Sequence, residues 1–294
     1  MLNELPPSAI VSGHSACPGC GGVLAEKMIM SAIRETIGDD FIFFGRGVCA
    51  NIGMGNLAHP YVRFNFSFVG SPAAGIVAAL EMQGRTHTKV IEGQGDGAVS
   101  DIGMAKFSAC AERNDNILLY CVDNEAYMNT GIQRSSQTPW MAWTLTTPLG
   151  KKIGRRKDLL MVMAAHKIPY IATASIAYPE GLKRKFKRAL AIEGFRFIHV
   201  NCPCPIGWNH AFDKTVEVAR LAVQTGMWKL VEVDHGLFTM TMKPKELLPV
   251  TAYTKLQERF NTLTDEHLQT LQRMTDVEYT EYMEKDGKQL FIMT

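Results

Sequence analysis

Residues 88–131 read TKVIEGQGDGAVSDIGMAKFSACAERNDNILLYCVDNEAYMNTG, two short apolar runs separated by an amphipathic stretch. The runs at 88–91 and 117–122 have the length of buried strands, and residues 102–113 between them have helical spacing. A strand–helix–strand unit of this kind implies that the two strands pair in parallel. Parallel strands bring their carboxyl ends to one edge of a sheet, so the polar residues that follow each strand are expected to lie together there.

The same alternation continues on both sides of this unit. We expect strands at Phe41–Phe44, Phe64–Val69, Thr88–Ile91, Ile117–Val122, Tyr170–Thr173 and Phe195–Val200. We expect helices over Gly22–Ile37, Pro72–Gln83, Ile102–Arg113, Asp158–His166, Glu180–Glu193 and Asp213–Thr225. This pattern predicts an α/β fold in which a mostly parallel sheet is covered by helices on both faces.

The pattern loosens after Val233. Thr264 has the character of an N-cap for a final short helix that is predicted to end at Met274, and the polar tail Tyr279–Thr294 is expected to be loosely held. We therefore divide the chain into a main domain over residues 1–235 and a C-terminal arm with a short helix over residues 236–294.

The composition is that of a folded globular protein, with 294 residues of which 46% are hydrophobic and 20% charged. Lys and Arg together number 31 and Asp and Glu 29, and a net charge of +2 gives no electrostatic reason to expect nucleic acid. No apolar run approaches the length of a membrane span, and the start MLNELPPSAI lacks the features of a secretory signal. We expect a cytoplasmic protein that binds neither nucleic acid nor membranes.

Gly95-Asp96-Gly97 follows the first strand of the opening unit, and Asn124 follows the second, 28 residues after Asp96. The glycines allow the backbone to approach a ligand closely, and a carboxylate suits Mg²⁺ that also binds phosphate oxygens. Asp96, Asn124 and the carbonyl group of Ala126 are a candidate Mg²⁺ site. The Gly-Asp-Gly triplet alone is also typical of a simple turn, but with Asn124 at this spacing it resembles a thiamine diphosphate signature.

The chain has seven cysteines, and they fall into two groups. Cys110 and Cys121 lie in apolar segments and are expected to be buried structural thiols. Four others stand beside Gly or Pro in turn-like contexts, namely Cys17, Cys20, Cys49 and Cys204. Their spacing is compatible with zinc, a redox dithiol or an iron–sulfur cluster, and the scattered single cysteines favour a [4Fe–4S] cluster over zinc.

Four motifs occur in order along the chain: SGHSACPGCG at Ser12–Gly21, Gly95-Asp96-Gly97, DNEAYMNTGIQR at Asp123–Arg134 and CPIGW at Cys204–Trp208. Together they resemble the beta subunit of the 2-oxoacid:ferredoxin oxidoreductases, most closely the pyruvate branch. The resemblance covers essentially the whole chain, up to the stretch PVTAYTKLQERF that begins at Pro249.

The resemblance implies the thiamine diphosphate-binding fold, with thiamine diphosphate, Mg²⁺ and one proximal [4Fe–4S] cluster in this subunit. Carried over by position, the cluster ligands are Cys17, Cys20, Cys49 and Cys204. The Mg²⁺ ligands are Asp96, Asn124 and the Ala126 carbonyl. Asn129 lies near the reactive ring and Thr130 follows it, and these two are the expected catalytic residues. The diphosphate cradle is shaped by Gly95, Gly97 and Gly131.

The sequence departs from the family pattern at two places. Gly47-Val48-Cys49-Ala50 stands where relatives usually have Gly-Cys-Ser, which makes Cys49 the least secure of the four ligands. Ser71-Pro72-Ala73 replaces a His- or Arg-containing helix start and is assigned no catalytic role. Cys202 is an additional cysteine beside Cys204, and we assign it no role.

The implied reaction is oxidative decarboxylation of a 2-oxoacid, with pyruvate as the first choice, to give acetyl-CoA, CO₂ and reduced ferredoxin from coenzyme A and oxidised ferredoxin. Oxalate, branched-chain or aryl 2-oxoacids are alternative substrates. A non-redox thiamine enzyme is a rival that needs no cysteines, and a non-catalytic subunit stabilised by zinc or a cluster is a second. We expect a complex with an alpha subunit that supplies a glutamate to the cofactor, and with gamma and delta subunits or their fused equivalents.

Overall fold

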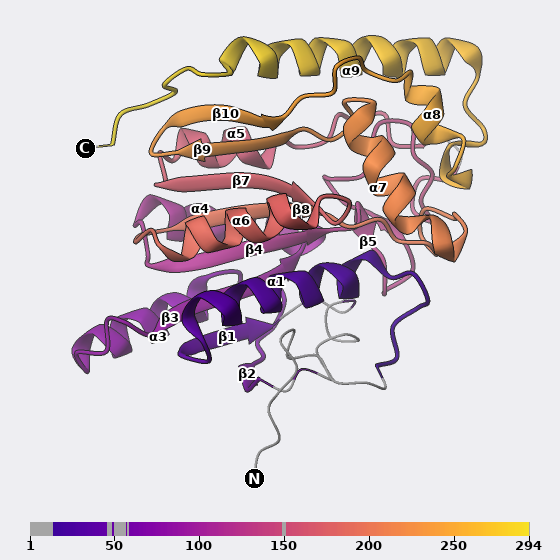
Figure 1. Ribbon diagram of the computed structural model, residues 1–294. Helices are drawn as coiled ribbons and strands as arrows, with labels where there is room; N and C mark the ends of the chain where they lie inside the picture. The colour runs from indigo at the N-terminus through magenta and orange to yellow at the C-terminus, as the bar shows by residue number, and fades with distance from the viewer. Residues whose placement is uncertain (1–13, 46–48, 50–56, 58, 149–150, 294) are drawn as a thin grey trace.

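The computed structural model describes residues 14–45, 49, 57, 59–148 and 151–293. Within these ranges an eight-stranded sheet has the order β10-β9-β7-β8-β4-β3-β1-β2 (Figure 1). Its strands are β1 (Phe41–Gly45), β2 (Tyr61–Val62), β3 (Lys89–Gly95), β4 (Ile117–Asp123), β7 (Tyr170–Ser175), β8 (Arg196–Asn201), β9 (Leu230–Asp234) and β10 (Leu237–Met242). A separate hairpin pairs β5 (Ala126–Tyr127) with β6 (Gln133–Arg134).

Helices cover both faces of the large sheet, as Figure 1 shows for α6 in front and α4 behind. One face carries α1 (Gly21–Ile37) and α6 (Pro179–Leu190). The other carries α3 (Ser71–Met82), α4 (Met104–Glu112), α5 (Leu159–Ala165) and part of α9 (Asp265–Lys285). A third cluster joins α7 (Thr215–Gln224) to the segment around α8 (Val250–Thr254). Because both faces are covered, every residue of β4 is buried, as expected for a central parallel strand.

Parallel pairing sets the direction of the strands that matter for the site. β4 pairs in parallel with β3 on one side and with β8 on the other, and β1 pairs in parallel with β3. The carboxyl ends of β1, β3, β4 and β8 therefore meet at one edge of the sheet. The first turn of α1 lies at the same edge, because Gly21 N donates to Pro203 O over 3.3 Å.

The α/β class, the mostly parallel sheet and the helices on both faces are confirmed. The strand expected at Phe64–Val69 is wrong, because the short edge strand is Tyr61–Val62 instead. Residues 65–68 form a turn closed by a hydrogen bond from Phe68 N to Asn65 O, with a length of 2.9 Å. The alternating aromatic side chains that imitated a strand are partly exposed, with Phe64 at 43% and Phe68 at 45%.

The helix expected to begin at Ile102 is preceded by a π-helical turn over Ala98–Ile102, and regular α-helix begins at Met104. The first part of the N-terminal motif, Ser12-Gly13, lies outside the described residues, as do Gly47, Val48 and Ala50 around Cys49.

The C-terminal segment differs most from expectation. The last helix, α9, does not end at Met274 but continues to Lys285, and the residues after it are tied to the sheet. Leu290 N donates to Gly236 O over 2.8 Å, and Gln289 forms a bridge with Leu237. The boundary placed at residue 235 falls in the turn of the antiparallel β9–β10 hairpin, which the sequence pattern missed. A division of the chain into two domains stays a prediction.

No helix in the described part of the chain is both long enough and apolar enough to cross a membrane.

Tyr282 is the residue that best tests the packing of α9. Its side chain is 9% exposed and its hydroxyl donates to Asp158 Oδ2 over 2.8 Å. We expect Tyr282→Ala to lower the free energy of unfolding by about 3–5 kcal/mol and Tyr282→Phe by about 1 kcal/mol, because the first empties a buried space and the second removes only a hydrogen bond.

The measurement is urea-induced unfolding, with Met283→Ala as the control. Met283 is 39% exposed, so its truncation should change the free energy by no more than about 0.5 kcal/mol. Equal effects of Tyr282→Ala and Met283→Ala would show that this part of α9 does not pack on the sheet.

Candidate active site

The expected site residues gather at the edge where β1, β3, β4 and β8 end. Cys49 follows β1, Asp96 follows β3, Asn124 follows β4 and Cys204 follows β8. They line a cavity of about 290 Å³. Eleven expected residues line it, namely Cys17, Cys20, Cys49, Gly95, Asp96, Gly97, Asn124, Ala126, Asn129, Thr130 and Cys204. The twelfth, Gly131, is not among the lining residues.

Three oxygen-bearing groups converge beside Asp96. One terminal atom of the Asn124 amide lies 3.2 Å from Asp96 Oδ1 and 2.8 Å from the Ala126 carbonyl oxygen. As a nitrogen, this atom donates a hydrogen bond to both neighbours; as an oxygen, it completes a set of three acceptors that only a cation can hold together. The three groups named from the sequence are thus brought together by the ends of β3 and β4.

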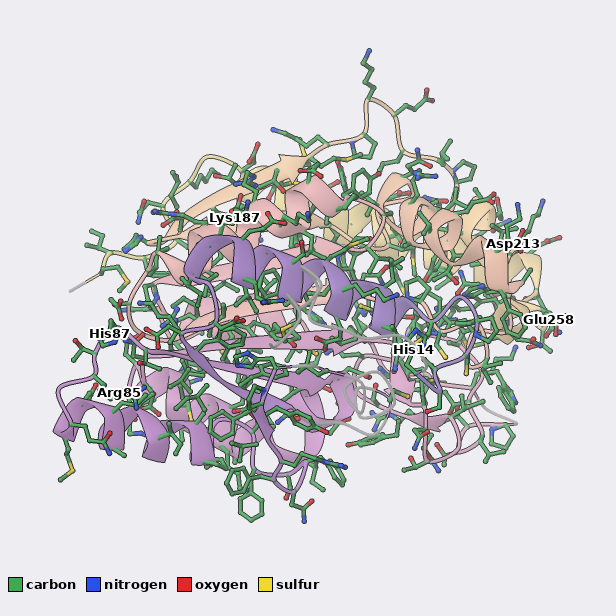
Figure 2. The ribbon with its side chains drawn as sticks, turned by 60° about the horizontal axis from the view of Figure 1, so that its bottom comes forward. His14, Arg85, His87, Lys187, Asp213 and Glu258 are labelled. Atoms are coloured by element: carbon green, nitrogen blue, oxygen red, sulfur yellow. The ribbon has the colours of Figure 1, made fainter. Side chains whose placement is uncertain are left out.

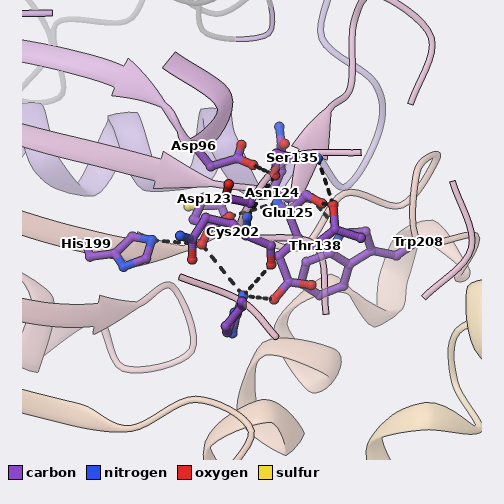
Figure 3. Close-up of polar contacts among 12 residues, drawn as sticks. Asp96, Asp123, Asn124, Glu125, Ser135, Thr138, His199, Cys202 and Trp208 are labelled. Carbon is purple, nitrogen blue, oxygen red and sulfur yellow. Dashed lines mark hydrogen bonds and ion pairs between the residues drawn. The ribbon is translucent and has the colours of Figure 1, made fainter. Parts of the chain in front are cut away.

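Asp96 is 2% exposed, and its Oδ2 accepts a hydrogen bond of 2.6 Å from the Ser135 hydroxyl (Figure 3). Burial raises the pKa of Asp96 well above its usual range, and the nearby Asp123 raises it further. The two carboxylates differ in their partners. Asp123 has His199 Nε2 at 2.8 Å and Arg156 Nη2 at 3.7 Å, whereas the partner of Asp96 is a neutral hydroxyl. A cation beside Asp96 would balance its charge.

Gly95 leaves room for a ligand. A Cβ atom added there would meet no protein atom within 4 Å, although the residue lines the cavity. The cavity therefore has open space next to the backbone of Gly95, directly before Asp96. Such space would allow a ligand to approach the backbone closely, and the role of Gly95 in cofactor binding stays a prediction.

Asn129 and Thr130 lie at the open side of the cavity and are both exposed. The Thr130 hydroxyl donates to Gln133 Oε1 over 2.6 Å. Gly131 follows with φ of +123°, in the turn that leads to β6. The turn therefore presents Asn129 toward the cavity and shapes the backbone through Gly131, without bringing Gly131 itself to the wall.

The thiols reach the cavity from three separate segments. Cys17 and Cys20 are joined by a turn in which Cys20 N donates to Cys17 O over 3.1 Å. Gly19 in this turn has φ of +68°, and an added Cβ would lie 2.1 Å from Phe212 O, so no larger residue fits. Thr215 Oγ1 holds this turn in place by donating a hydrogen bond of 2.6 Å to Gly19 O. Figure 2 shows that His14, shortly before the turn, and Asp213, shortly before Thr215, lie on the same side of the molecule.

The thiols influence one another across the cavity. The pKa of Cys49 is raised to about 12, mainly by burial and in smaller part by Cys204 and Cys20, against the opposing effect of a backbone hydrogen bond from Asn129. The Cys204 sulfur accepts a hydrogen bond from Gly207 N over 3.3 Å. All seven cysteines are free thiols. Among the described residues no three His, Cys, Asp or Glu side chains are close enough to share one metal ion.

Cys110 and Cys121 are buried in the core between the sheet and the helices of its second face, as expected. Cys202 was assigned no role, but it lines the cavity as well. It is fully buried and its sulfur donates to Val200 O over 3.3 Å. Sequence reasoning gave no signal that separates Cys202 from the expected ligand two residues later.

Glu26 lines the cavity and was missed by the sequence analysis. It is 3% exposed on α1, its Oε2 accepts a hydrogen bond of 2.7 Å from Tyr120, and its Oε1 has no partner. Burial raises the pKa of Glu26 to about 7. The available signal was an acidic residue on the apolar side of the predicted helix, close to Val23.

Comparisons with known proteins agree with this geometry. Residues 59–200 match the family described as thiamine pyrophosphate enzyme, C-terminal TPP binding domain. Pyruvate synthase subunit PorB of Methanocaldococcus jannaschii is 41% identical over 280 residues, which cover 90% of this chain and 93% of the relative. The chain belongs to the beta subunits of the 2-oxoacid:ferredoxin oxidoreductases.

A second relative of this beta subunit has a different name. Ketoisovalerate oxidoreductase subunit VorB of Pyrococcus abyssi is 40% identical over 279 residues, which cover 89% of this chain and 88% of the relative. The beta subunit is thus part of a thiamine diphosphate-dependent oxidoreductase. Membership of this family argues against the non-redox thiamine enzyme and the non-catalytic subunit considered from the sequence.

A solved structure with the same fold is the 2-oxoglutarate:ferredoxin oxidoreductase of Magnetococcus marinus with 2-oxoglutarate, coenzyme A and succinyl-CoA bound. The TM-score is 0.59 at 22% identity, and the match covers 75% of the beta subunit and 81% of that chain. At this identity the match supports the fold alone.

The raised pKa of Glu26 makes a prediction about stability. Between the ordinary pKa of 4.5 and about 7 the folded beta subunit holds a proton on Glu26 that the unfolded chain has released. The free energy of unfolding therefore falls as pH rises through this window and levels off above it. From pH 5 to pH 8 we expect Glu26→Gln to gain about 2 to 3 kcal/mol relative to the wild type.

Urea-induced unfolding at a series of pH values measures this difference. Tyr120→Phe is the matched variant: it removes the hydrogen bond that lowers the pKa of Glu26, so the fall in the free energy of unfolding should continue to a higher pH. Parallel curves for the wild type and Glu26→Gln would contradict a protonated Glu26 in the cavity.

Proposed function

We propose that this beta subunit serves in the oxidative decarboxylation of pyruvate, with coenzyme A, to acetyl-CoA and CO₂, passing two electrons to ferredoxin. The observation that carries the proposal is the shared cavity: oxygen ligands suited to a thiamine diphosphate–Mg²⁺ site and four thiols suited to a cluster line the same space. Thiamine diphosphate, when bound, supplies the electron sink for loss of CO₂. Electrons leaving such a site need an acceptor nearby, and the thiols provide a place for one.

The oxygen groups beside Asp96 fit Mg²⁺. Octahedral Mg²⁺ binds oxygen at about 2.1 Å, which places neighbouring ligands about 3.0 Å apart. The two distances at the Asn124 amide, 3.2 Å to Asp96 Oδ1 and 2.8 Å to Ala126 O, lie on either side of this value. In this role Asp96 supplies the negative charge, and Ser135 orients it by a hydrogen bond.

The thiols fit a [4Fe–4S] cluster better than zinc. Four thiolates on one zinc ion at about 2.3 Å would stand close together. No such close group occurs among the described side chains. In a [4Fe–4S] cluster each thiolate binds a different iron and the sulfurs stand farther apart. The hydrogen bond from Gly207 N to Cys204 Sγ is of the kind that adjusts a cluster's potential. Cys17, Cys20, Cys49 and Cys204 are the proposed ligands.

A branched-chain 2-oxoacid is the second candidate substrate. It is favoured by the VorB relative, whose identity of 40% is close to the 41% of the PorB relative. Pyruvate stays the first choice because the resemblance of the motifs is closest to that branch.

The proposed enzyme is a complex. The match to a TPP-binding domain spans residues 59–200, and the other half of a thiamine site is a second domain. We propose an alpha subunit that supplies this domain with its glutamate, gamma and delta subunits or fused equivalents, and ferredoxin as the electron acceptor.

A substrate panel tests the proposed function. The purified complex is supplied anaerobically with pyruvate, 2-ketoisovalerate, an aryl 2-oxoacid or oxalate, each with and without coenzyme A, and reduction of ferredoxin is followed. We expect the highest kcat/KM with pyruvate and a requirement for coenzyme A. Preference for 2-ketoisovalerate would select the second candidate, and activity without coenzyme A would contradict the proposed products.

Asp96 is the sharpest test of the Mg²⁺ site. We expect Asp96→Asn to weaken thiamine diphosphate binding in the presence of Mg²⁺ on the order of 100-fold, because a neutral amide cannot replace the charge beside a divalent cation. Isothermal titration calorimetry on the complex, with and without Mg²⁺, measures this loss. Ser135→Ala removes only the hydrogen bond to the Asp96 carboxylate, so it should weaken thiamine diphosphate binding by about fivefold. Unchanged affinity in Asp96→Asn would refute the ligand assignment.

Cys204 tests the cluster. We expect Cys204→Ser to lose iron and the broad visible absorption of the cluster, while Cys110→Ser, Cys121→Ser and Cys202→Ser keep both. The first two controls lie in the core, and the third is a cavity-lining thiol two residues before Cys204 that is fully buried. Iron analysis of purified complexes decides the matter. Full iron content in Cys204→Ser, or its loss in Cys202→Ser, would show that the ligand set is wrong.

A further inference from the structure

One guanidinium group contacts two of the loops that contribute residues to the cavity wall. Arg259 belongs to a short 3₁₀ turn, Glu258–Phe260, in the C-terminal segment and is only 4% exposed. Its Nη2 lies 2.6 Å from Glu125 Oε2, a close ion pair whose angle falls outside hydrogen-bond geometry. The central guanidinium carbon of Arg259, Cζ, lies 3.9 Å from the centre of the Trp208 ring. Arg259 therefore touches a residue after β4 and a residue after β8 at the same time.

Glu125 belongs to the loop that carries the proposed Mg²⁺ ligands. It directly follows Asn124 and has φ of +65°, a left-handed conformation that is strained for a residue other than glycine. The carbonyl group of Glu125 accepts a hydrogen bond of 2.6 Å from Thr138 (Figure 3). A residue keeps a strained backbone conformation only when the surrounding structure stabilises it. The ion pairs of Glu125 with Arg156 and Arg259 contribute to this stabilisation.

Trp208 belongs to the loop that carries the proposed cluster ligand Cys204. Trp208 N donates to Cys204 O over 2.9 Å, and the ring is fully buried. The indole Nε1 donates to Asn124 O over 2.7 Å, as Figure 3 shows. The two loops are thus joined directly by this hydrogen bond and indirectly through Arg259.

We propose that Arg259 is a positioning residue that fixes the loop at 123–127 and the loop at 204–208 relative to each other. This inference rests on the proposed function, in which the first loop binds the Mg²⁺ of the cofactor and the second binds the cluster. A guanidinium group suits the role because it pairs with a carboxylate through its edge while it stacks on an aromatic ring through its face. An ammonium group can keep the charge but not both contacts.

Arg156 provides a matched comparison within the same site. Its Nη2 lies 2.5 Å from the other oxygen of Glu125, Oε1, but its guanidinium lies over Trp228 at 5.3 Å instead of Trp208. Arg156 supports the loop at 123–127 without touching the loop at 204–208. Arg156→Lys and Arg259→Lys therefore remove similar groups from the same carboxylate, and only the second removes a contact with the cysteine loop.

The experiment is hydrogen–deuterium exchange of the whole complex, read by mass spectrometry with and without thiamine diphosphate and Mg²⁺. In the wild type and in Arg156→Lys we expect the cofactor to slow exchange at both 123–131 and 202–210. In Arg259→Lys we expect slowing at 123–131 only, with the effect at 202–210 reduced on the order of tenfold. Trp208→Phe, which keeps a ring under Arg259 but loses the hydrogen bond to Asn124 O, should give an intermediate effect.

Slowing at 202–210 in Arg259→Lys equal to that in the wild type would overturn the proposal, as would its loss in Arg156→Lys. If the wild-type complex binds no thiamine diphosphate, it is the proposed function that fails. Arg259→Gln is a second variant for the case in which Arg259→Lys does not fold, and it is read in the same way.

Discussion

Parallel pairing of β4 with both of its neighbours is the constraint on which the rest of the structure depends. β3 and β8 run in the same direction as β4, so whatever follows these three strands must share one edge of the sheet. Asp96, Asn124 and Cys204 meet there although they come from distant parts of the sequence. A reversal of any one strand would carry its loop to the opposite edge and divide the cavity.

Because these loops share one edge of the sheet, several charged side chains are buried close together there. Asp96, Asp123 and Glu125 are each at most 2% exposed. Two guanidinium groups from more distant segments offset the charges of Asp123 and Glu125, and the imidazole of His199 hydrogen-bonds to Asp123. Removing one partner from such a set is strongly unfavourable, because the remaining charge stays buried. The hydrogen-bond partner of Asp96 is the neutral Ser135 hydroxyl, so its charge is the one that the proposed metal ion would balance.

The central strands and the Asp96–Asn124 pair could be predicted because their signals are local. Ile117–Val122 is a continuous apolar run. Gly95-Asp96-Gly97 alone is also typical of a simple turn, and Asn124 at its spacing after the next strand is what made the pair predictable. Phe64–Val69 misled because alternating aromatics imitate a strand while Asn65 begins a turn. The end of α9 and the roles of Glu26 and Arg259 could not be predicted. Each depends on a partner far along the chain, which neither periodicity nor spacing encodes.

The place of Arg259 in the chain has a consequence for biosynthesis. Its ion-pair partner Glu125 lies in the first half of the chain, and Arg259 lies near the end. A protein made from its N-terminus can form the strands of the sheet early, but the loop after β4 lacks this counter-charge until the last segment has left the ribosome. In the proposed function, the loop that would hold the metal ion of the cofactor therefore reaches its final conformation only once Arg259 has docked, after the strands of the sheet have formed.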